Sequence, residues 1–176
     1  MRDVINKNVH EEELLRACAN AFECGKNQVK LYFMDGLPTE TREDVEGIAK
    51  LAKTVVDSYY SNPNVKRGKS PQVTISVACF IPKPFTPFQW EAQDTIEMLE
   101  EKQHWLREAI TDRKIRYTWH DARVSRIEAV FARGDRRLSA ALLEAHRRGR
   151  RFDAWDEYFD YDEWLDIFAS VGIDPA

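Results

Sequence analysis

The sequence lacks two features that would place the chain in a membrane or export it from the cell. No run of about 18 apolar residues occurs in its 176 residues, so the sequence predicts no transmembrane helix. The opening stretch, MRDVINKNVHEEELL, has no apolar core of the kind that signal peptides contain. We therefore expect a cytoplasmic protein.

Cysteine is also scarce, and the chain has no excess of positive charge. Cys18 and Cys24 are six residues apart on one predicted helix, which is not a ligand spacing of zinc or iron–sulfur sites, and Cys79 lies in an apolar run. Without an export signal, all three are expected to be reduced thiols that pack as small hydrophobic side chains. The formal net charge of -4 argues against attraction of the whole surface to nucleic acid or an anionic membrane.

What the chain does have is an alternation of helical and strand patterns. Helices are predicted at about residues 10–24, 41–60, 94–111, 124–133, 135–148 and 161–171, and strands at 29–34, 73–80 and 115–119. Strands that alternate with helices form parallel sheets, and right-handed crossovers place those helices on one face. The sequence therefore predicts an α/β fold, as either a small open sheet or part of a (β/α) barrel, because three strands cannot close a barrel.

The start of the chain is unusual for an α/β domain. Such domains normally begin by laying a strand into the sheet. Here the first predicted element is a helix, and MRDVINKNV in front of it has no strand pattern. We therefore expect that the chain is cut out of a longer polypeptide.

The most prominent candidate site is the segment from Leu31 to Thr41, LYFMDGLPTET. Ligands of parallel α/β folds lie at the carboxyl ends of strands. Gly36 permits a close approach of backbone and ligand, Pro38 stiffens the turn, and the following helix offers free amide groups. Glu40 is expected beside that site. The alternative is an ordinary turn from strand to helix.

Two further segments contain side chains that could take part in chemistry. FIPKPFTPFQWE, residues 80–91, forms a rigid loop with Phe85, Phe88 and Trp90, either lining a substrate entrance or packing as a hydrophobic plug. His120 and Asp121 could provide a general base or a metal ligand, but neighbouring residues on a strand point to opposite faces. We favour a structural or capping role for that pair.

The last third of the chain contains two blocks of opposite charge. Residues 133–151 contain seven arginines and two acidic residues, and residues 153–166 contain seven acidic residues. The blocks are expected to pair with each other or to face solvent. The alternative is an RNA-binding patch, in which Trp155 and Tyr158 stack on bases.

Several segments in combination resemble one enzyme family. They are RDVINKNVHEEELL, LYFMDGLPTETREDVEGIAKLAK, VTISVACFIPKPFTPFQWE, WHDARVSRIEAVFARGDRRLSAALLEAHRRG and FDAWDEYF. Together they resemble the C-terminal half of a radical S-adenosylmethionine (radical SAM) domain, as in uncharacterised radical SAM proteins, Fe–S oxidoreductase-like, with an N-terminal cobalamin-binding-like domain. The resemblance covers nearly the whole chain. It implies a partial barrel at residues 1–120 and a helical extension at 121–176.

The resemblance also implies a cofactor site. Radical SAM enzymes hold a 4Fe–4S cluster on a C-x3-C-x2-C loop, and the cluster cleaves S-adenosylmethionine to a 5′-deoxyadenosyl radical. Two strands of their barrel contact the adenine of S-adenosylmethionine, and these match residues 31–40 and 77–82 here. Residues expected to form this cofactor-binding wall are Phe33 and Met34 through their backbone, Gly36, Glu40, Phe80 and Ile81.

The sequence departs from the family in one decisive respect, because it contains no C-x3-C-x2-C. Without three thiolates a cluster has no protein ligands. We therefore expect no metal or cofactor in this fragment, with the cluster and S-adenosylmethionine bound by the full-length enzyme. Its expected partners are the missing N-terminal half or a second copy of the fragment. The alternative is an autonomous RNA- or protein-interaction module that uses the arginine-rich helix.

Overall fold

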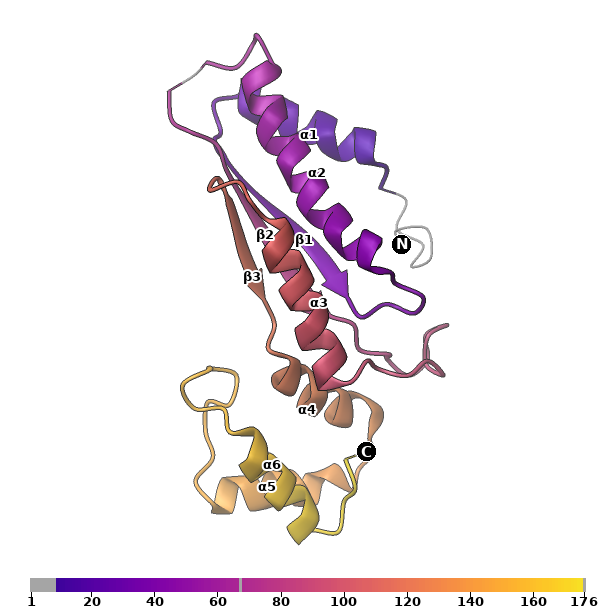
Figure 1. Ribbon diagram of the computed structural model, residues 1–176. Coiled ribbons are helices and arrows are strands. Elements are labelled where there is room, and N and C mark those ends of the chain that lie inside the picture. The colour runs from indigo at the N-terminus through magenta and orange to yellow at the C-terminus, as the bar shows by residue number, and fades with distance from the viewer. Residues whose placement is uncertain (1–8, 67, 176) are drawn as a thin grey trace. The chain divides into compact units, whose positions relative to one another are not determined.

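The computed structural model describes residues 9–66 and 68–175, and this part of the chain forms three strands and six helices (Figure 1). It divides into two compact units. The first contains the described residues up to Phe80 together with Glu97–Trp119, and the second contains Ile81–Ile96 and the described residues from His120 onward. The predicted α/β fold with three parallel strands, covering helices and a helical C-terminal part is confirmed.

The sheet of the first unit is parallel, with the strand order β1-β2-β3 over the described residues. Its strands are β1 (Gln28–Asp35), β2 (Gln72–Cys79) and β3 (Ile115–Trp119). Asp35 at the end of β1 lies opposite Cys79 at the end of β2. The carboxyl ends of these two strands therefore lie side by side, where parallel α/β folds place their ligands.

Local signals in the sequence set the ends of the first helices. Helix α1 (Glu11–Glu23) stops before Gly25, whose φ of 83° is the left-handed conformation that favours glycine. Helix α2 (Arg42–Ser61) begins with the predicted capping arrangement. The Thr41 hydroxyl accepts the Asp44 N–H at 3.2 Å, and the Asp44 carboxylate accepts the Thr41 N–H at 3.0 Å.

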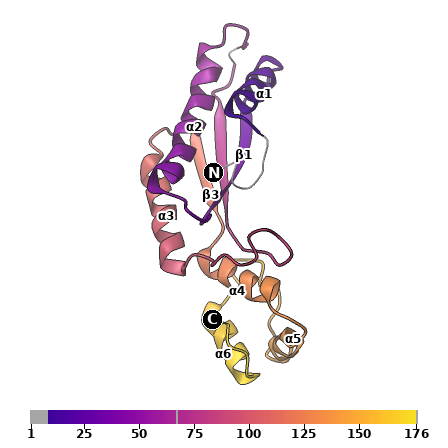
Figure 2. The same cartoon turned by 90° about the vertical axis from the view of Figure 1, so that its right-hand side faces the viewer.

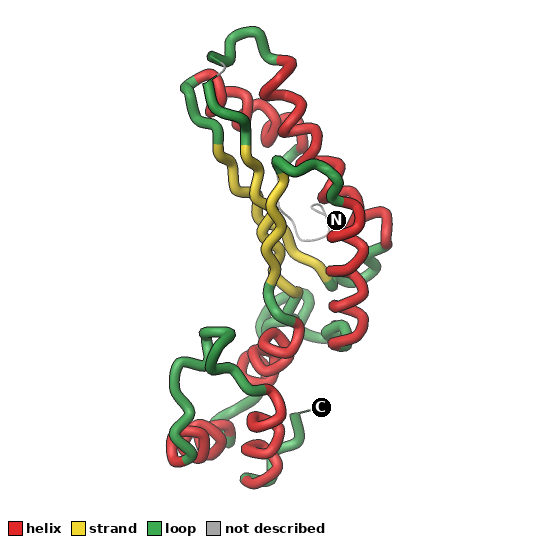
Figure 3. The backbone as a smooth tube through the Cα atoms, turned by 60° about the vertical axis from the view of Figure 1, so that its left-hand side comes forward, coloured by secondary structure: helices red, strands yellow, loops and turns green. Residues whose placement is uncertain are grey.

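One face of the sheet is buried under α1, α2 and α3 (Ile96–Ala109). Alternate side chains of β2, namely Val73, Ile75 and Val77, are almost fully buried there. They pack with residues such as Val55 of α2 and Leu106 of α3, and Figure 3 shows these two helices along one side of the strands. Burial of each such aliphatic side chain contributes about 1.5–3 kcal/mol.

The opposite face of the sheet is open within the described part of the chain. Tyr32 of β1 is 75% exposed there, with the Lys30 ammonium 5.0 Å from its ring centroid. The remaining side chains on this face are mostly small or polar: Met34, Thr74, Ser76, Ala78, Arg116 and Thr118. Parallel sheets are usually covered on both faces, so this arrangement is unusual for a complete domain.

The second unit has a separate helical core formed by α4 (Ala122–Arg133), α5 (Leu138–Arg147) and α6 (Tyr161–Ser170), which appear together in Figure 2. Phe131 packs edge-to-face on Trp164, with the ring centroids 5.4 Å apart. A side chain at Gly134 would meet Leu138 Cδ1 at 2.2 Å and the Val130 carbonyl at 2.8 Å. Glycine is therefore required where the chain passes from α4 to α5.

Candidate functional site

The predicted turn after β1 is a tight structure built around Gly36. Gly36 has a φ of 76° and Thr39 a φ of 64°, both in the left-handed region. The Glu40 N–H donates to the Leu37 carbonyl at 3.0 Å, and the Glu40 carboxylate accepts the Gly36 N–H at 2.8 Å. Gly36, which has no side chain, is therefore held in a buried turn at the end of β1, next to the end of β2.

The Glu40 side chain points into the protein. Its carboxylate lies 3.0 Å from the Lys102 ammonium of α3, and the two side chains are only 3% and 9% exposed. The same oxygen, Oε2, accepts the Gly36 N–H. Glu40 therefore connects the Gly36 turn to α3.

Asp35, the last residue of β1, is a buried carboxyl group at 2% exposure. Its Oδ1 has no hydrogen-bond partner within the described structure. Burial, and secondly the negative charge of Glu40, raise the pKa of Asp35 to about 7, although Cys79 and Lys102 oppose the shift. The backbone carbonyl of Asp35 accepts the Phe80 N–H at 2.7 Å, which fixes the end of β1 to the end of β2.

Three more polar side chains complete this buried cluster. Gln103 of α3 donates to the Cys79 sulfur at 3.6 Å. The Tyr117 hydroxyl of β3 is buried without a hydrogen-bond partner in the described structure. Burial raises the pKa of Tyr117, and the nearby Asp35 raises it further. We call Asp35, Glu40, Cys79, Lys102, Gln103 and Tyr117 the strand-end cluster.

The residues that the sequence predicted for the cofactor wall have different environments. Phe33 packs against the helix-covered core, whereas Met34 lies on the open face, because neighbouring strand residues alternate. Phe80 and Ile81 are both buried. Gly36 lies at the strand ends, but it is buried and its N–H is bonded to the Glu40 carboxylate. The assignment of these residues to a cofactor site stays a prediction.

The proline-rich loop after β2 exposes two of its aromatic side chains, whereas Phe88 is partly buried. Phe85 is 97% exposed and Trp90 is 86% exposed, so neither packs as the plug considered above. The Thr86 hydroxyl donates to the Lys83 carbonyl at 2.7 Å, which stabilises a turn at this point. A role for this loop at a substrate entrance stays a prediction.

The His120–Asp121 pair has the predicted capping role, provided by Asp121. Its carboxylate accepts the N–H groups of Arg123 at 2.7 Å and Val124 at 3.1 Å at the start of α4. Replacing Asp121 with alanine should lower the free energy of unfolding by about 0.5–2 kcal/mol, while asparagine should restore most of it. Urea denaturation of both variants measures this, and an alanine variant as stable as the wild type would contradict the assignment.

The opposite charge blocks do pair, as predicted, at Arg150. Its guanidinium contacts Asp153 and donates to Glu163 at 2.8 Å. Aromatic side chains in the same segment remain outside the core, and Trp155 is 62% exposed. This exposed aromatic segment, with Phe152, Trp155 and Tyr158 next to the arginine-rich block, has features of a binding surface.

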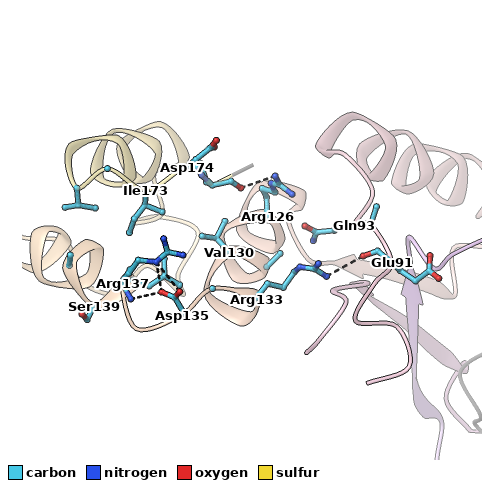
Figure 4. A pocket seen from close by; sticks show the side chains of 18 residues that line it. Glu91, Gln93, Arg126, Val130, Arg133, Asp135, Arg137, Ser139, Ile173 and Asp174 are labelled. Carbon is cyan, nitrogen blue, oxygen red and sulfur yellow. Dashed lines mark hydrogen bonds and ion pairs between the residues drawn. The ribbon is translucent and has the colours of Figure 1, made fainter. Parts of the chain in front are cut away.

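A cavity of about 950 Å³ lies within the second unit, between α4, the residues around Glu91 and the segment after α6 (Figure 4). Arg126 donates to the Pro175 carbonyl at 3.0 Å, and Arg133 donates to the Glu91 carbonyl at 3.4 Å. These arginines hold neighbouring segments of the unit together. None of the residues predicted for the cofactor wall lines this cavity.

Two structural findings bear on metals and membranes. Within residues 9–66 and 68–175, no group of three or more His, Cys, Asp or Glu side chains is placed to hold a metal ion. In the same ranges, no helix has both the length and the apolar content needed to cross a bilayer.

The chain is similar to an uncharacterized protein of Methanocaldococcus jannaschii, with 30% identity over 177 residues. The match covers 95% of this chain but 37% of that protein, so the chain spans little more than a third of the length of this relative. No protein-family profile matches the chain, and no solved structure matches it. The similarity extends over both units and assigns no activity.

Proposed function

We propose that this chain forms the C-terminal part of a radical SAM enzyme, in which the Gly36 turn contacts the adenine of S-adenosylmethionine. The observation that carries the proposal is the left-handed Gly36 turn at the carboxyl end of β1, on a parallel sheet with one open face. This agrees with the resemblance of residues 31–40 to the adenine-side strand of such barrels. The greater length of the M. jannaschii relative is consistent with further segments completing the barrel.

In this proposal the residues of the chain bind and orient the cofactor. The backbone at Gly36 approaches the adenine because no Cβ stands in the way. The small side chains of Thr74, Ser76 and Ala78 on the open face leave room for a substrate. A 4Fe–4S cluster on a C-x3-C-x2-C loop of the full-length enzyme would supply the electron for cleavage of S-adenosylmethionine.

A pair of glycine variants tests the role of the turn in the full-length polypeptide. Gly36→Ala adds a Cβ at a φ of 76°, whereas Gly47→Ala in α2 adds one where nothing lies within 4 Å. We expect Gly36→Ala to weaken S-adenosylmethionine binding about tenfold or more. The added Cβ strains the left-handed backbone and also obstructs the approach of the adenine, and the two costs add. Gly47→Ala should bind like the wild type. Equal affinity of both variants in equilibrium dialysis would sink the proposed contact.

A second candidate function is supported by the exposed aromatic segment. Trp155 and Tyr158 are exposed close in sequence to Arg147 and Arg151, and such side chains stack on single-stranded RNA. Binding of a single-stranded RNA that weakens steeply with salt, and weakens further in Trp155→Ala, would support an interaction module. No RNA retention at low salt would exclude it.

A further inference from the structure

The cavity of the second unit has two arginines on its wall whose guanidinium groups are bonded to neutral acceptors. Arg126 and Arg133 lie seven residues apart on α4, which places them on one face of the helix. Arg126 donates to the Pro175 carbonyl at 3.0 Å. Arg133 donates to the carbonyls of Pro82 at 3.3 Å and Glu91 at 3.4 Å. We call Arg126 and Arg133 the tethered arginines, because these backbone contacts hold both cations at the cavity.

The carboxylates on the wall of the cavity do not pair with the tethered arginines. Asp135 accepts both the backbone N–H and the guanidinium of Arg137 at 2.9 Å, so this pair balances itself. The side chains of Glu91 and Asp174 point away from the tethered arginines in Figure 4. Within the described part of the chain, no carboxylate forms an ion pair with either tethered arginine. The cavity wall therefore has two positive charges that no described side chain balances directly.

A hydrogen-bond acceptor on the same wall lacks a donor. Gln93 lines the cavity and donates through Nε2 to the Ser125 carbonyl at 3.2 Å, next to Arg126 in the chain. Its Oε1 is buried and has no hydrogen-bond partner among the described residues. Figure 4 shows Gln93 between the tethered arginines. A buried acceptor without a donor costs free energy, so an O–H or N–H group of a bound molecule would be favoured at this position.

The size and the remaining walls of the cavity suit a small organic molecule. Its volume of about 950 Å³ lies in the range of about 300–1,000 Å³ that is typical of ligand pockets. Val130, Leu138 and Ile173 also line it, and they belong to the helical core of the second unit. Ligand pockets commonly combine such apolar side chains with a few polar groups that fix the orientation of the ligand.

We infer that this cavity binds a phosphate monoester that also carries hydroxyl groups, such as a sugar phosphate. A phosphate monoester has a charge of about -1.5 to -2 near pH 7, which balances the two tethered arginines, whereas one carboxylate balances only one of them. Guanidinium groups are weakly hydrated and form strong charge-assisted hydrogen bonds with phosphate oxygens. A hydroxyl group of the ligand donates to Gln93 Oε1.

The inferred site is independent of the proposed contact with S-adenosylmethionine. Every residue that lines the cavity belongs to the second unit, and none of them belongs to the predicted cofactor wall. Phosphate binding can therefore be measured on the 176-residue chain without cluster or cofactor. Its failure is distinguishable from failure of the proposed function.

Isothermal titration calorimetry of the chain with ribose 5-phosphate, inorganic phosphate and ribose tests the inference. We expect ribose 5-phosphate to bind most tightly, because it offers both the dianion and the hydroxyl groups. Ribose should bind at least about tenfold more weakly, because it has no charge for the tethered arginines. The inference is overturned if ribose binds as tightly as ribose 5-phosphate, or if ribose 5-phosphate does not bind at up to about 10 mM.

Three variants assign the binding to the cavity. Arg133→Gln should weaken the binding of ribose 5-phosphate and of inorganic phosphate about tenfold or more. Gln93→Leu should weaken ribose 5-phosphate about threefold or more and leave inorganic phosphate unchanged, because only the sugar supplies the carbon-bound hydroxyl groups. Arg136→Gln removes an exposed arginine of the same unit that does not line the cavity, and it should bind like the wild type.

The control variant separates a site from general attraction. Equal weakening in Arg133→Gln and Arg136→Gln would mean that phosphate responds to the overall charge of the unit, and it would overturn the inference. The comparison of the three probes on the wild-type chain decides the matter even if a variant fails to fold.

Discussion

Replacing Lys102 with alanine is expected to lower the free energy of unfolding of the first unit by about 3–5 kcal/mol. The variant removes the Lys102 ammonium, 3.0 Å from the Glu40 carboxylate, while that carboxylate stays buried at 3% exposure. It also removes the aliphatic stem of a side chain that packs in the stripe between Leu99 and Leu106. Urea denaturation at neutral pH measures the loss.

An exposed ion pair on α2 provides the matched control. Lys53 pairs with Asp57 one turn away, and both side chains are about half exposed. Lys53→Ala should change stability by at most about 1 kcal/mol, because exposed pairs contribute little. In the Lys102→Met, Glu40→Gln double variant neither charge remains, so much of the stability should return. Equal losses in Lys102→Ala and Lys53→Ala would show that the buried pair does not stabilise the fold.

Asp35→Asn is expected to stabilise the protein at alkaline pH and to leave it nearly unchanged near pH 4. The pKa of Asp35 rises from 3.8 to about 7 on folding, so the folded state binds the proton more tightly than the unfolded state. The contribution of Asp35 to stability is therefore full below about pH 4, falls between about pH 4 and 7, and stays low above that. The full shift corresponds to an upper limit of about 4 kcal/mol.

The pH dependence of unfolding separates this effect from a simple change in packing. The difference in unfolding free energy between Asp35→Asn and the wild type should grow between about pH 4 and pH 7 and then level off. Asp57→Asn, at an exposed position of α2, controls for the loss of a surface charge. A difference that is constant with pH would mean that the pKa of Asp35 is the same in the folded and the unfolded protein.

The elements of the fold could be predicted because their signals are local. Gly25 ends α1, and the Thr41–Asp44 cap begins α2, at the positions that the sequence indicates. The apolar runs at β1 and β2 are too short for helices. The structure extends the first by one residue at each end and shifts the second by one residue toward the N-terminus. The prolines keep the loop after β2 out of the sheet, and Phe85 of this loop is exposed. Whether the aromatic side chains of the loop pack depends on contacts that no local sequence pattern encodes.

The candidate site could be predicted in position but not in mechanism. The Gly36 turn follows from a strand end and a glycine, both visible in the sequence. The groups near Glu40 and Asp35 could not be predicted in this way. Lys102, which pairs with Glu40, and Tyr117, which interacts electrostatically with Asp35, come from elements far along the chain. One signal was available: Lys102 occupies the apolar stripe of α3, three residues after Leu99 and four before Leu106, so its charge had to be buried and paired.

The most direct test of the proposed function is product analysis of the full-length polypeptide after anaerobic reconstitution with iron and sulfide. With S-adenosylmethionine and a reductant, we predict a bound 4Fe–4S cluster and the release of 5′-deoxyadenosine. The 176-residue chain treated in the same way should bind no cluster, because it contains no C-x3-C-x2-C. A full-length protein that binds no cluster and forms no 5′-deoxyadenosine would contradict the assignment to radical SAM chemistry.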